Sequence, residues 1–422
     1  MSNLKLLIWF FEDDVKPLNR AFTALDSRYG IECFDIVGVI GGYKLFFKGK
    51  EQNNISITSL PLETNYDYVI VSGINPNIII DRVALRKELA KKIQTSSESI
   101  IFDFEIYDNT FSFPKVCLVV IFNHRFDNNL PLLRKIYGNR FSDIRFLMPF
   151  YDGSDDDVIP VYEASYSHQG YLIQAYEKLK DIPCTHYLFL ADDAIIHPEF
   201  DEINFIARAK VYDKKFLCSY LNPLNNPNVF RWWWTPESSK PFYDYLINWK
   251  DSIYTYDDAL AKFNEFFGFK YKEVYDEAFF GDPNKPGKTR FDSWSDAEGF
   301  EKVKNKFIVT NRNTLHIPYP MTFGPVDIFC IDKESLFEFS RLCGIFAAMN
   351  MFVEIAIPTA AVLTYKRKDV VFFQRESFRF MWDGNERNLF ADKYGRDFTR
   401  LYNEWDDKLF VVHPVKLSGW KL

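Results

Sequence analysis

Two adjacent carboxylates, Asp192 and Asp193, directly follow a hydrophobic run from Tyr187 to Ala191. If that run is a buried strand, the pair lies at its carboxyl end, where open α/β sheets bind their ligands. Hard divalent cations require oxygen ligands, and a cation held there can bridge the protein to a diphosphate and neutralise its charge. The pair therefore predicts a site for Mn²⁺ or Mg²⁺. The alternative interpretation is a solvated turn of two aspartates at a strand end.

A third carboxylate, Glu354, lies in the apolar segment from Met351 to Pro358. A buried glutamate is rare unless it is paired or functional, and removal from water raises its pKa toward the range that a general base needs. The alternative for Glu354 is a buried salt bridge with an arginine. Asp327 is the competing candidate for the base, or it could bind hydroxyl groups of the molecule that gives up the proton.

Composition limits the classes of function. The chain has 422 residues, more than one hydrophobic core supports, so two or three units are expected. The net charge of -7 argues against a nucleic-acid partner, because phosphate backbones select basic surfaces. There is no run of about 18 apolar residues that would predict a membrane span. The six cysteines are scattered without a CxxC pair, which favours free thiols in a reducing, cytoplasmic compartment.

Alternating strand and helix patterns that could position the carboxylates begin after Pro114. The expected strands are 116–122, 144–149, 158–162 and 186–191, and the expected helices are 130–137 and 169–179, the latter capped by Ser167. The pattern is weaker from 222 to 306, and strand or helix signals return at 328–330, 336–349 and 370–373. Continuous apolar strands such as the first one are typical of a central parallel sheet.

The residues up to 112 form a separate series with strands expected at 4–11, 34–40 and 68–72 and helices at 15–29 and 81–93. This alternation predicts a small Rossmann-like α/β domain with a parallel sheet. Its first turn carries Glu12, Asp13 and Asp14 where a dinucleotide site would have GxGxxG. Because those carboxylates would repel a pyrophosphate, a scaffolding role is preferred over nucleotide binding.

From residue 115 to 198 the chain resembles the nucleotide-binding half of the GT-A glycosyltransferases. In that family a first strand and two further strands with a helix lead to a strand that ends in an Asp-x-Asp or Asp-Asp signature. The matching positions here are Asn123 and Arg125 after the first strand, Asp152 after the second, and Asp192 with Asp193 after the last. Residues 319–420 match the family loosely.

The resemblance implies a GT-A-like, mixed but mainly parallel sheet with flanking helices over residues 113–422. Residues 113–220 would form the nucleotide-binding half, and 221–422 the acceptor half with its C-terminal tail. It also implies a glycosyltransferase that moves a sugar from a nucleoside diphosphate sugar, a UDP-sugar above all, to a glycan or lipid-linked glycan. A bacterial branch involved in surface polysaccharides is the nearest match.

The resemblance also assigns roles to single residues. It places Phe122, Asn123 and Arg125 near the base and ribose, Asp152 as a hydrogen-bond acceptor for either, and His168 and Gln169 beside the diphosphate or donor sugar. Asp192 and Asp193 would hold the metal, and Asp192 would also lie at the nucleotide. Several GT-A families return a C-terminal histidine to the metal and a nearby lysine to the diphosphate, which His413 and Lys416 match. In inverting members a carboxylate at the position of Glu354 or Asp327 deprotonates the acceptor.

Two segments suggest further contacts. The three tryptophans Trp232, Trp233 and Trp234 could stack on pyranose rings, make a peripheral membrane contact at the inner membrane face, or belong to a core. The loop 281–290 could close over the diphosphate or be an ordinary exposed loop. Two other functions stay open. A nucleotidyltransferase acting on sugar phosphates normally carries a Gly-rich phosphate loop, which 123–125 lacks. A non-catalytic carbohydrate-binding scaffold would not need Asp193.

Overall fold

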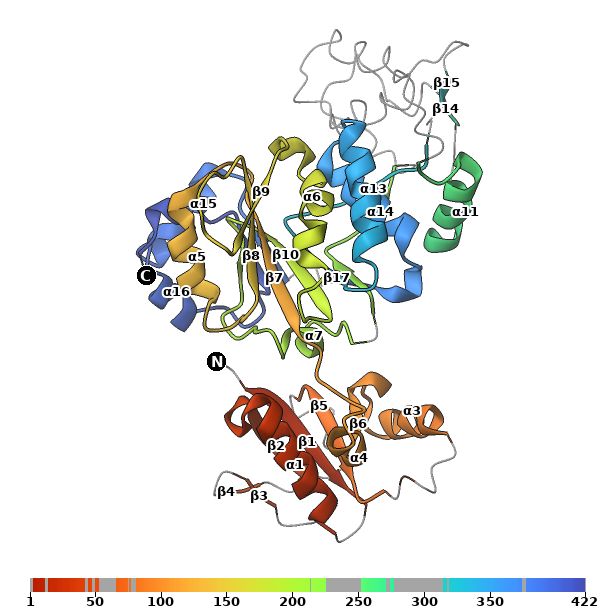
Figure 1. The fold of residues 1–422 in the computed structure, drawn as a ribbon, viewed down its shortest axis with the longest axis vertical. Helices are drawn as coiled ribbons and strands as arrows, with labels where there is room; N and C mark the ends of the chain where they lie inside the picture. Colours follow the sequence, from red (N-terminus) through yellow and green to blue (C-terminus); the bar gives the residue numbers. More distant parts are fainter. Residues whose placement is uncertain are drawn as a thin grey trace. The chain divides into compact units, whose positions relative to one another are not determined.

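The computed structural model describes residues 3–11, 14–41, 45–47, 50–52, 66–74, 76, 81–212, 214–224, 252–270, 274–276, 314–316, 319–373 and 377–421 (Figure 1). The chain divides into two compact units. The first comprises Met1–Val116, Asn139–Ser142 and Pro198–Asp213, and the second Cys117–Gly138, Asp143–His197 and Lys214–Leu422. Both are α/β with flanking helices, so the general class expected from the sequence is confirmed.

The first unit is built on a four-stranded parallel sheet in the order β2-β1-β5-β6. The strands are β1 (Leu4–Phe10), β2 (Phe34–Ile40), β5 (Tyr68–Ser72) and β6 (Ile100–Phe102), and the helices are α1 (Lys16–Tyr29), α3 (Arg82–Ile93) and α4 (Asp103–Tyr107). Successive side chains of a strand point to opposite faces. Accordingly, Leu6 and Ile8 join one core and Leu7 and Trp9 the other. With both faces covered, every residue of β1 except Lys5 is apolar.

A later segment, Pro198–Asp213, completes this first unit. It contains the short helix α7 (Phe205–Arg208), whose Ala207 is part of the core beside β1. Arg208 lies 3.6 Å from the carboxylate of Asp67, and the hydroxyl of Tyr212 donates a 2.9 Å hydrogen bond to the Asp67 carbonyl. The first unit is therefore assembled from residues more than a hundred positions apart, as the 145-residue separation of that hydrogen bond shows.

We expect Ser72→Ala to lower the free energy of unfolding of the first unit by about 1–3 kcal/mol. Ser72 Oγ donates a 2.7 Å hydrogen bond to Asp103 Oδ2, and burial raises the pKa of Asp103. Without the hydroxyl, the buried carboxyl loses the shorter of its hydrogen bonds from Ser72 and Gly73. Chemical denaturation measures the change. The exposed Ser96→Ala is the control and should stay within about 0.5 kcal/mol of the wild type. Equal stability of both variants would contradict the prediction.

The second unit contains a seven-stranded mixed sheet in the order β18-β12-β17-β10-β7-β8-β9. Its strands are β7 (Val116–Ile121), β8 (Ile144–Pro149), β9 (Val158–Val161), β10 (His186–Ala191), β12 (Phe216–Cys218), β17 (Ile328–Asp332) and β18 (Val370–Phe372). β7, β8 and β9 pair in parallel, whereas β17 is antiparallel to β10 and β12. The mixed character matches the expectation, while the assignment to the GT-A family stays a prediction.

Helices cover one face of this sheet. Side chains of α6 (Gly170–Leu179), α13 (Leu336–Ala348) and α14 (Val353–Thr364) share a core with alternate residues of β7, such as Val119 and Ile121. Figure 1 shows α6 and α13 side by side, and α11 (Tyr256–Phe267) joins the same core. The helix α5 (Leu130–Tyr137) connects β7 to β8.

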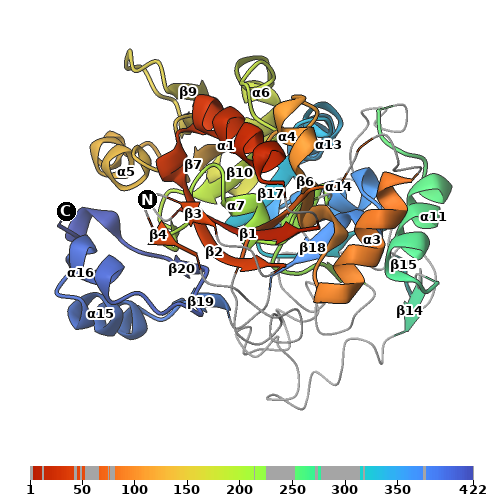
Figure 2. The same cartoon turned by 90° about the horizontal axis from the view of Figure 1, so that it is seen from below.

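A second, three-stranded sheet in the order β11-β20-β19 returns the C-terminal tail to the end of β10. β11 (Ile195–Ile196) follows Asp193 closely and pairs antiparallel with β20 (Val411–His413), which pairs in parallel with β19 (Phe378–Phe380). The helices α15 (Gly384–Lys393) and α16 (Phe398–Asn403) separate the two strands in sequence. Figure 2 shows β19 and β20 adjacent to α15 and α16.

The expected helix cap at Ser167 is wrong. Ser167 does not cap α6: the residue before the helix is Gln169, which makes no side-chain capping bond, and Ser167 lies in a short 3-10 turn.

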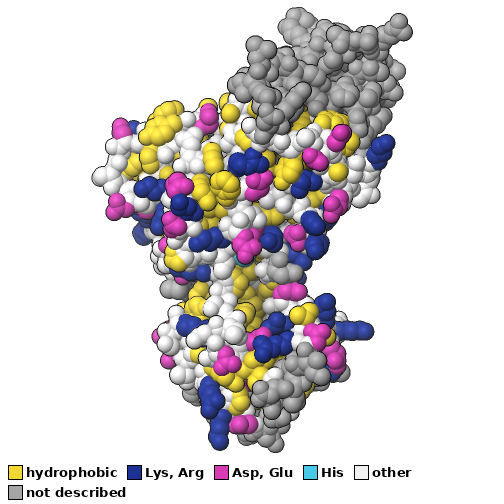
Figure 3. Space-filling model, turned by 45° about the vertical axis from the view of Figure 1, so that its right-hand side comes forward, with side chains coloured by type: hydrophobic (Ala, Val, Ile, Leu, Met, Phe, Trp, Pro, Cys, Tyr) yellow, Lys and Arg dark blue, Asp and Glu magenta, His cyan; other side chains and the backbone are white. Residues whose placement is uncertain are grey.

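Among the described helices, none is both long and apolar enough to cross a membrane. All six cysteines are free thiols. On the face shown in Figure 3, the basic and acidic side chains of the described residues intermingle.

Candidate active site

The paired carboxylates lie at the carboxyl end of β10, a strand whose six residues are all buried. Two backbone hydrogen bonds fix the position of the pair. The Asp192 N–H donates to the carbonyl of Ile121 at 2.9 Å, and the Val415 N–H donates to the carbonyl of Asp193 at 2.7 Å. The first bond ties the pair to the end of β7 and the second ties it to the C-terminal tail, so segments far apart in sequence define this point.

His413 and Lys416 both reach Asp193. His413 Nε2 lies 3.0 Å from Asp193 Oδ1 and 3.5 Å from Asp327 Oδ1. Lys416 Nζ lies 3.5 Å from Asp193 Oδ2. The imidazole is buried, whereas the lysine side chain is 70% exposed, so the ammonium group is free to contact an incoming anion. The sequence predicted these residues for one site, and the fold brings them together.

Asp327 and Glu354 belong to the same cluster. The N–H of Ala191, the last residue of β10, donates to the Asp327 carbonyl at 2.8 Å. Glu354 lies in the first turn of α14, and its carbonyl accepts a 3.0 Å hydrogen bond from the N–H of Gly324. We name the five residues Asp192, Asp193, Asp327, Glu354 and His413 the carboxylate cluster.

The two adjacent aspartates have different protonation behaviour. Burial and the neighbouring charge of Asp193 raise the pKa of Asp192 to about 7. Burial also acts to raise the pKa of Asp193, but His413 and Lys416 outweigh it and bring the pKa below its ordinary value. At neutral pH Asp193 is therefore the permanent anion of the pair, and Asp192 gains or loses its proton easily.

The remaining members are coupled to each other. Burial acts to lower the pKa of His413, but the carboxylates of Asp327 and Asp193 raise it above the ordinary value. Burial and the charge of Asp327 raise the pKa of Glu354 to about 8, with His413 opposing them. Within the described residues, no ion pair joins Glu354 to an arginine. The charged groups that shift its pKa are instead Asp327 and His413, both members of the cluster.

The donor set around Asp193 suits a shared cation. Within the described part of the chain, no group of three or more His, Cys, Asp or Glu side chains is arranged to hold a metal ion by itself. Mg²⁺ is usually bound by one or two carboxylates together with substrate phosphates. The 3.0 Å between His413 Nε2 and Asp193 Oδ1 equals the spacing of two neighbouring ligands about 2.1 Å from one octahedral ion. Asp193 Oδ1 is buried, and its partner among the described residues is His413 Nε2.

The residues assigned to the nucleotide lie after β7 and β8. Arg125 is exposed and pairs with Asp152 at 2.5 Å and with Asp127 at 3.1 Å. The hydrogen bond from Arg125 lowers the pKa of Asp152. Asn123 is half-buried, and its backbone N–H donates to the carboxylate of Asp192. Phe122 is fully buried and its ring packs edge-on against Phe146, so this side chain contributes to the core.

His168 and Gln169 lie side by side just before α6, and both are buried. Gln169 Nε2 donates a 2.8 Å hydrogen bond to the carbonyl of Met351, which connects α6 to the segment leading into α14. Burial lowers the pKa of His168 to about 4, so its ring is neutral. Among the described residues, neither ring nitrogen of His168 nor Gln169 Oε1 has a hydrogen-bond partner. Among the described residues, no hydrogen bond or ion pair joins this pair to the carboxylate cluster.

Sequence reasoning missed two residues of the site. Asn129 Nδ2 donates a 3.4 Å hydrogen bond to Asp192 Oδ2. Trp382 is 63% exposed, and its ring centroid lies 5.2 Å from that of His413. Neither stands near the paired aspartates in sequence, and neither belongs to a periodic pattern, so only the fold reveals them. The tryptophans 232–234 and the loop 281–290 lie outside the described residues.

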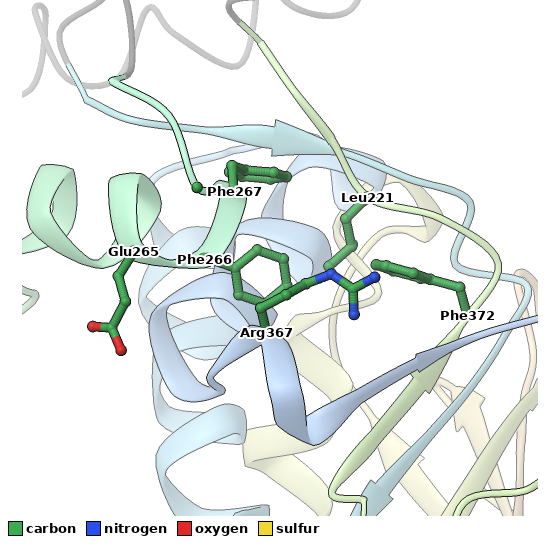
Figure 4. Close-up of a pocket in the computed structure, with 7 residues that line it drawn as sticks. Leu221, Glu265, Phe266, Phe267, Arg367 and Phe372 are labelled. Carbon is green, nitrogen blue, oxygen red and sulfur yellow. The ribbon is translucent and has the colours of Figure 1, made fainter.

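An open cavity of about 350 Å³ occurs elsewhere in the second unit, and none of its lining residues is a predicted site residue. Figure 4 shows the Arg367 guanidinium extending between the rings of Phe266 and Phe372. Its centre lies 4.5 Å from the Phe372 ring centroid, a cation–π contact. The cavity therefore does not define the candidate active site.

Comparison of the chain with models of protein families and with curated proteins gives no match, so the functional assignment rests on the geometry of the carboxylate cluster itself.

Proposed function

We propose that the second unit is a metal-assisted glycosyltransferase that moves a sugar from a nucleoside diphosphate sugar to a glycan or lipid-linked glycan. The observation that supports this most is the convergence of Asp193, Asp327, His413 and Lys416 at the end of the central strand β10. A UDP-sugar is the proposed donor, and synthesis of a bacterial polysaccharide is the proposed setting.

Asp193 and His413 would hold a divalent cation, Mn²⁺ or Mg²⁺, which when bound supplies positive charge to the leaving diphosphate. Lys416 adds a point charge for the phosphates because its side chain is exposed and lies 3.5 Å from Asp193. Asp192 has a pKa of about 7, so it would lose its proton and become negatively charged when a cation binds beside it. Asn129 holds this carboxyl through its side-chain amide.

Glu354 is the proposed general base. Its pKa of about 8 is well matched to accepting a proton from an acceptor hydroxyl near neutral pH. The proton would pass to the Glu354 carboxylate while the hydroxyl oxygen forms its bond to the anomeric carbon and the bond from that carbon to the diphosphate oxygen breaks, which releases the nucleoside diphosphate. The charge of Asp327 raises the pKa of Glu354, and the charge of His413 lowers the pKa of Asp327. Asp327 is therefore the proposed positioning residue for the base Glu354.

The proposed base and ribose contacts lie at Arg125 and Asp152. These two side chains pair with each other. A nucleoside would exchange that exposed ion pair, which contributes little by itself, for hydrogen bonds to the base or ribose. His168 and Gln169 offer buried polar atoms without described partners for the donor sugar or diphosphate.

We expect UDP to stabilise the protein against thermal unfolding only when Mn²⁺ or Mg²⁺ is present. A ligand at about 100 times its dissociation constant stabilises the native state by about 2.7 kcal/mol. Differential scanning fluorimetry with UDP, UDP-sugars and each metal alone measures the shift, and uridine without phosphates is the control. Equal stabilisation by UDP in excess EDTA would remove the metal from the proposal. No stabilisation by any nucleotide would remove the function.

A further inference from the structure

We propose that three aromatic side chains next to the carboxylate cluster, Phe378, Phe380 and Trp382, form a binding strip for the sugar rings of the acceptor. This inference rests on the proposed function, because it names the acceptor side of the same site. The three residues, called the aromatic strip below, stand at every second position of β19 and its continuation. Alternate residues of a strand share one face.

The rings of the aromatic strip are nearly parallel. Phe378 and Phe380 have centroids 5.5 Å apart with an interplanar angle of 13°, and Phe380 and Trp382 have centroids 6.0 Å apart with an angle of 6°. Phe373 and Phe410 anchor the strip at the Phe378 end, with centroids 4.9 and 6.3 Å from the Phe378 ring. The strip is therefore a stack of similarly oriented rings, and Trp382 is its exposed member.

The other end of the strip meets the carboxylate cluster. Phe380 is paired in register with His413, and its ring centroid lies 6.2 Å from the imidazole. The indole of Trp382 is closer, at 5.2 Å and 78°, an edge-to-face contact. A sugar ring on Trp382 would thus lie next to the histidine that contacts Asp193 and Asp327.

Trp382 is exposed but its backbone is held firmly. Arg387 Nη1 donates hydrogen bonds to the carbonyls of Met381 at 3.0 Å and Trp382 at 2.7 Å, and the Met381 N–H donates to the His413 carbonyl at 2.8 Å. The next residue, Asp383, caps α15 through the N–H of Asn385. The Trp382 side chain is large and apolar, yet 63% of it is exposed, so it gains little stabilisation from burial. A fixed backbone under an exposed aromatic ring beside the cluster favours a ligand-binding role.

A pyranose ring is the ligand chemistry that fits. Aromatic faces carry negative electrostatic potential, and the C–H bonds on one side of a sugar ring are weakly positive. The sugar hydroxyls point outward from such a stack and keep their water. The charged pairs suited to ribose and phosphate lie instead at Arg125 and Lys416. An oligosaccharide acceptor with a sugar ring on the exposed Trp382 would therefore place its terminal hydroxyl at the carboxylate cluster.

The test uses the full-length protein labelled with 5-fluorotryptophan, in which ¹⁹F NMR follows the Trp382 signal after assignment with Trp382→Phe. Maltotriose, cellotriose and chitotriose are the probes, with and without UDP and Mn²⁺, and glycerol is the control solute. We expect at least one trisaccharide to shift the signal saturably. Phe380→Ala should weaken that binding about three- to tenfold. Leu389→Ala, an exposed apolar position on α15, should leave it unchanged.

Three outcomes would contradict the proposal that the aromatic strip binds sugar. They are the absence of any trisaccharide response in either state, an equal effect of Phe380→Ala and Leu389→Ala, and a response to phosphatidylglycerol vesicles but to no sugar. The thermal test with UDP and metal is independent of the strip. If UDP stabilises the protein and no sugar shifts Trp382, the strip is wrong and the proposed function stands. If the reverse holds, the strip binds sugars on a protein that is not a transferase.

Discussion

Replacement of Asp193 by Asn is expected to abolish the metal-dependent binding of UDP, with at least a hundredfold loss of affinity. Asp193 is the carboxylate that both His413 and Lys416 contact, and its pKa is below the ordinary value, so it is charged at every pH of interest. An amide keeps the shape and removes the charge that a divalent cation requires. Isothermal titration calorimetry with Mn²⁺ and UDP measures the loss.

Asp192→Asn is the matched comparison. With a pKa of about 7, Asp192 is partly protonated in the free protein, and Asn resembles its neutral form. The affinity for Mn²⁺ and UDP should therefore fall by a smaller factor than in Asp193→Asn. Both variants are titrated only after melting curves show that they are folded. If Asp193→Asn binds UDP with unchanged metal dependence, the cation site lies elsewhere.

The order of elements around the paired aspartates could be predicted from the sequence because the governing signals are local. β8 and β10 have the predicted bounds, since each is a short apolar run between turn residues. The tail was harder to place. β20 has three residues, and its pairing with β11 spans more than 200 positions, so only the family resemblance at His413 and Lys416 pointed to the site.

Other parts of the site depend on contacts that no local pattern encodes. Glu354 lies in the first turn of α14. This helix is hard to predict from the sequence because Pro358 lies inside it, and proline is unfavourable in a helix interior. Trp382 and Asn129 acquire their places only through long-range packing against His413 and Asp192. The burial of Phe122 follows from a local pattern. Strand alternation puts it on the face opposite Ile121, where Phe146 buries it.

The pH dependence of turnover should identify Glu354. A general base works when it has lost its proton, so turnover should rise about tenfold per pH unit below 8 and level off above it, given a pKa of about 8. Stability should change in the opposite direction. The pKa is raised on folding, so the native state binds more protons than the unfolded chain at intermediate pH, and stability falls between the ordinary glutamate pKa and about 8.

Glu354→Gln is expected to reduce turnover by roughly two to four orders of magnitude while the affinity for UDP and Mn²⁺ stays within about twofold. The amide cannot accept the proton, and the proposed contacts to metal and diphosphate belong to Asp193, His413 and Lys416. Release of UDP by slow hydrolysis of the donor, followed from pH 6 to 9, provides the assay. The variant should also lose the rise of turnover with pH.

Melting curves of the same variant separate catalysis from structure. Gln resembles the protonated glutamate, so Glu354→Gln should melt with the wild type at pH 6 and at a higher temperature at pH 9, where the wild type contains a buried charge. A structural ion pair predicts the reverse, because Gln would leave a buried cation unpaired and the variant would melt early. An early-melting variant with normal turnover while folded would exclude Glu354 as the base. Asp327, which lies 3.5 Å from His413, would then take its place.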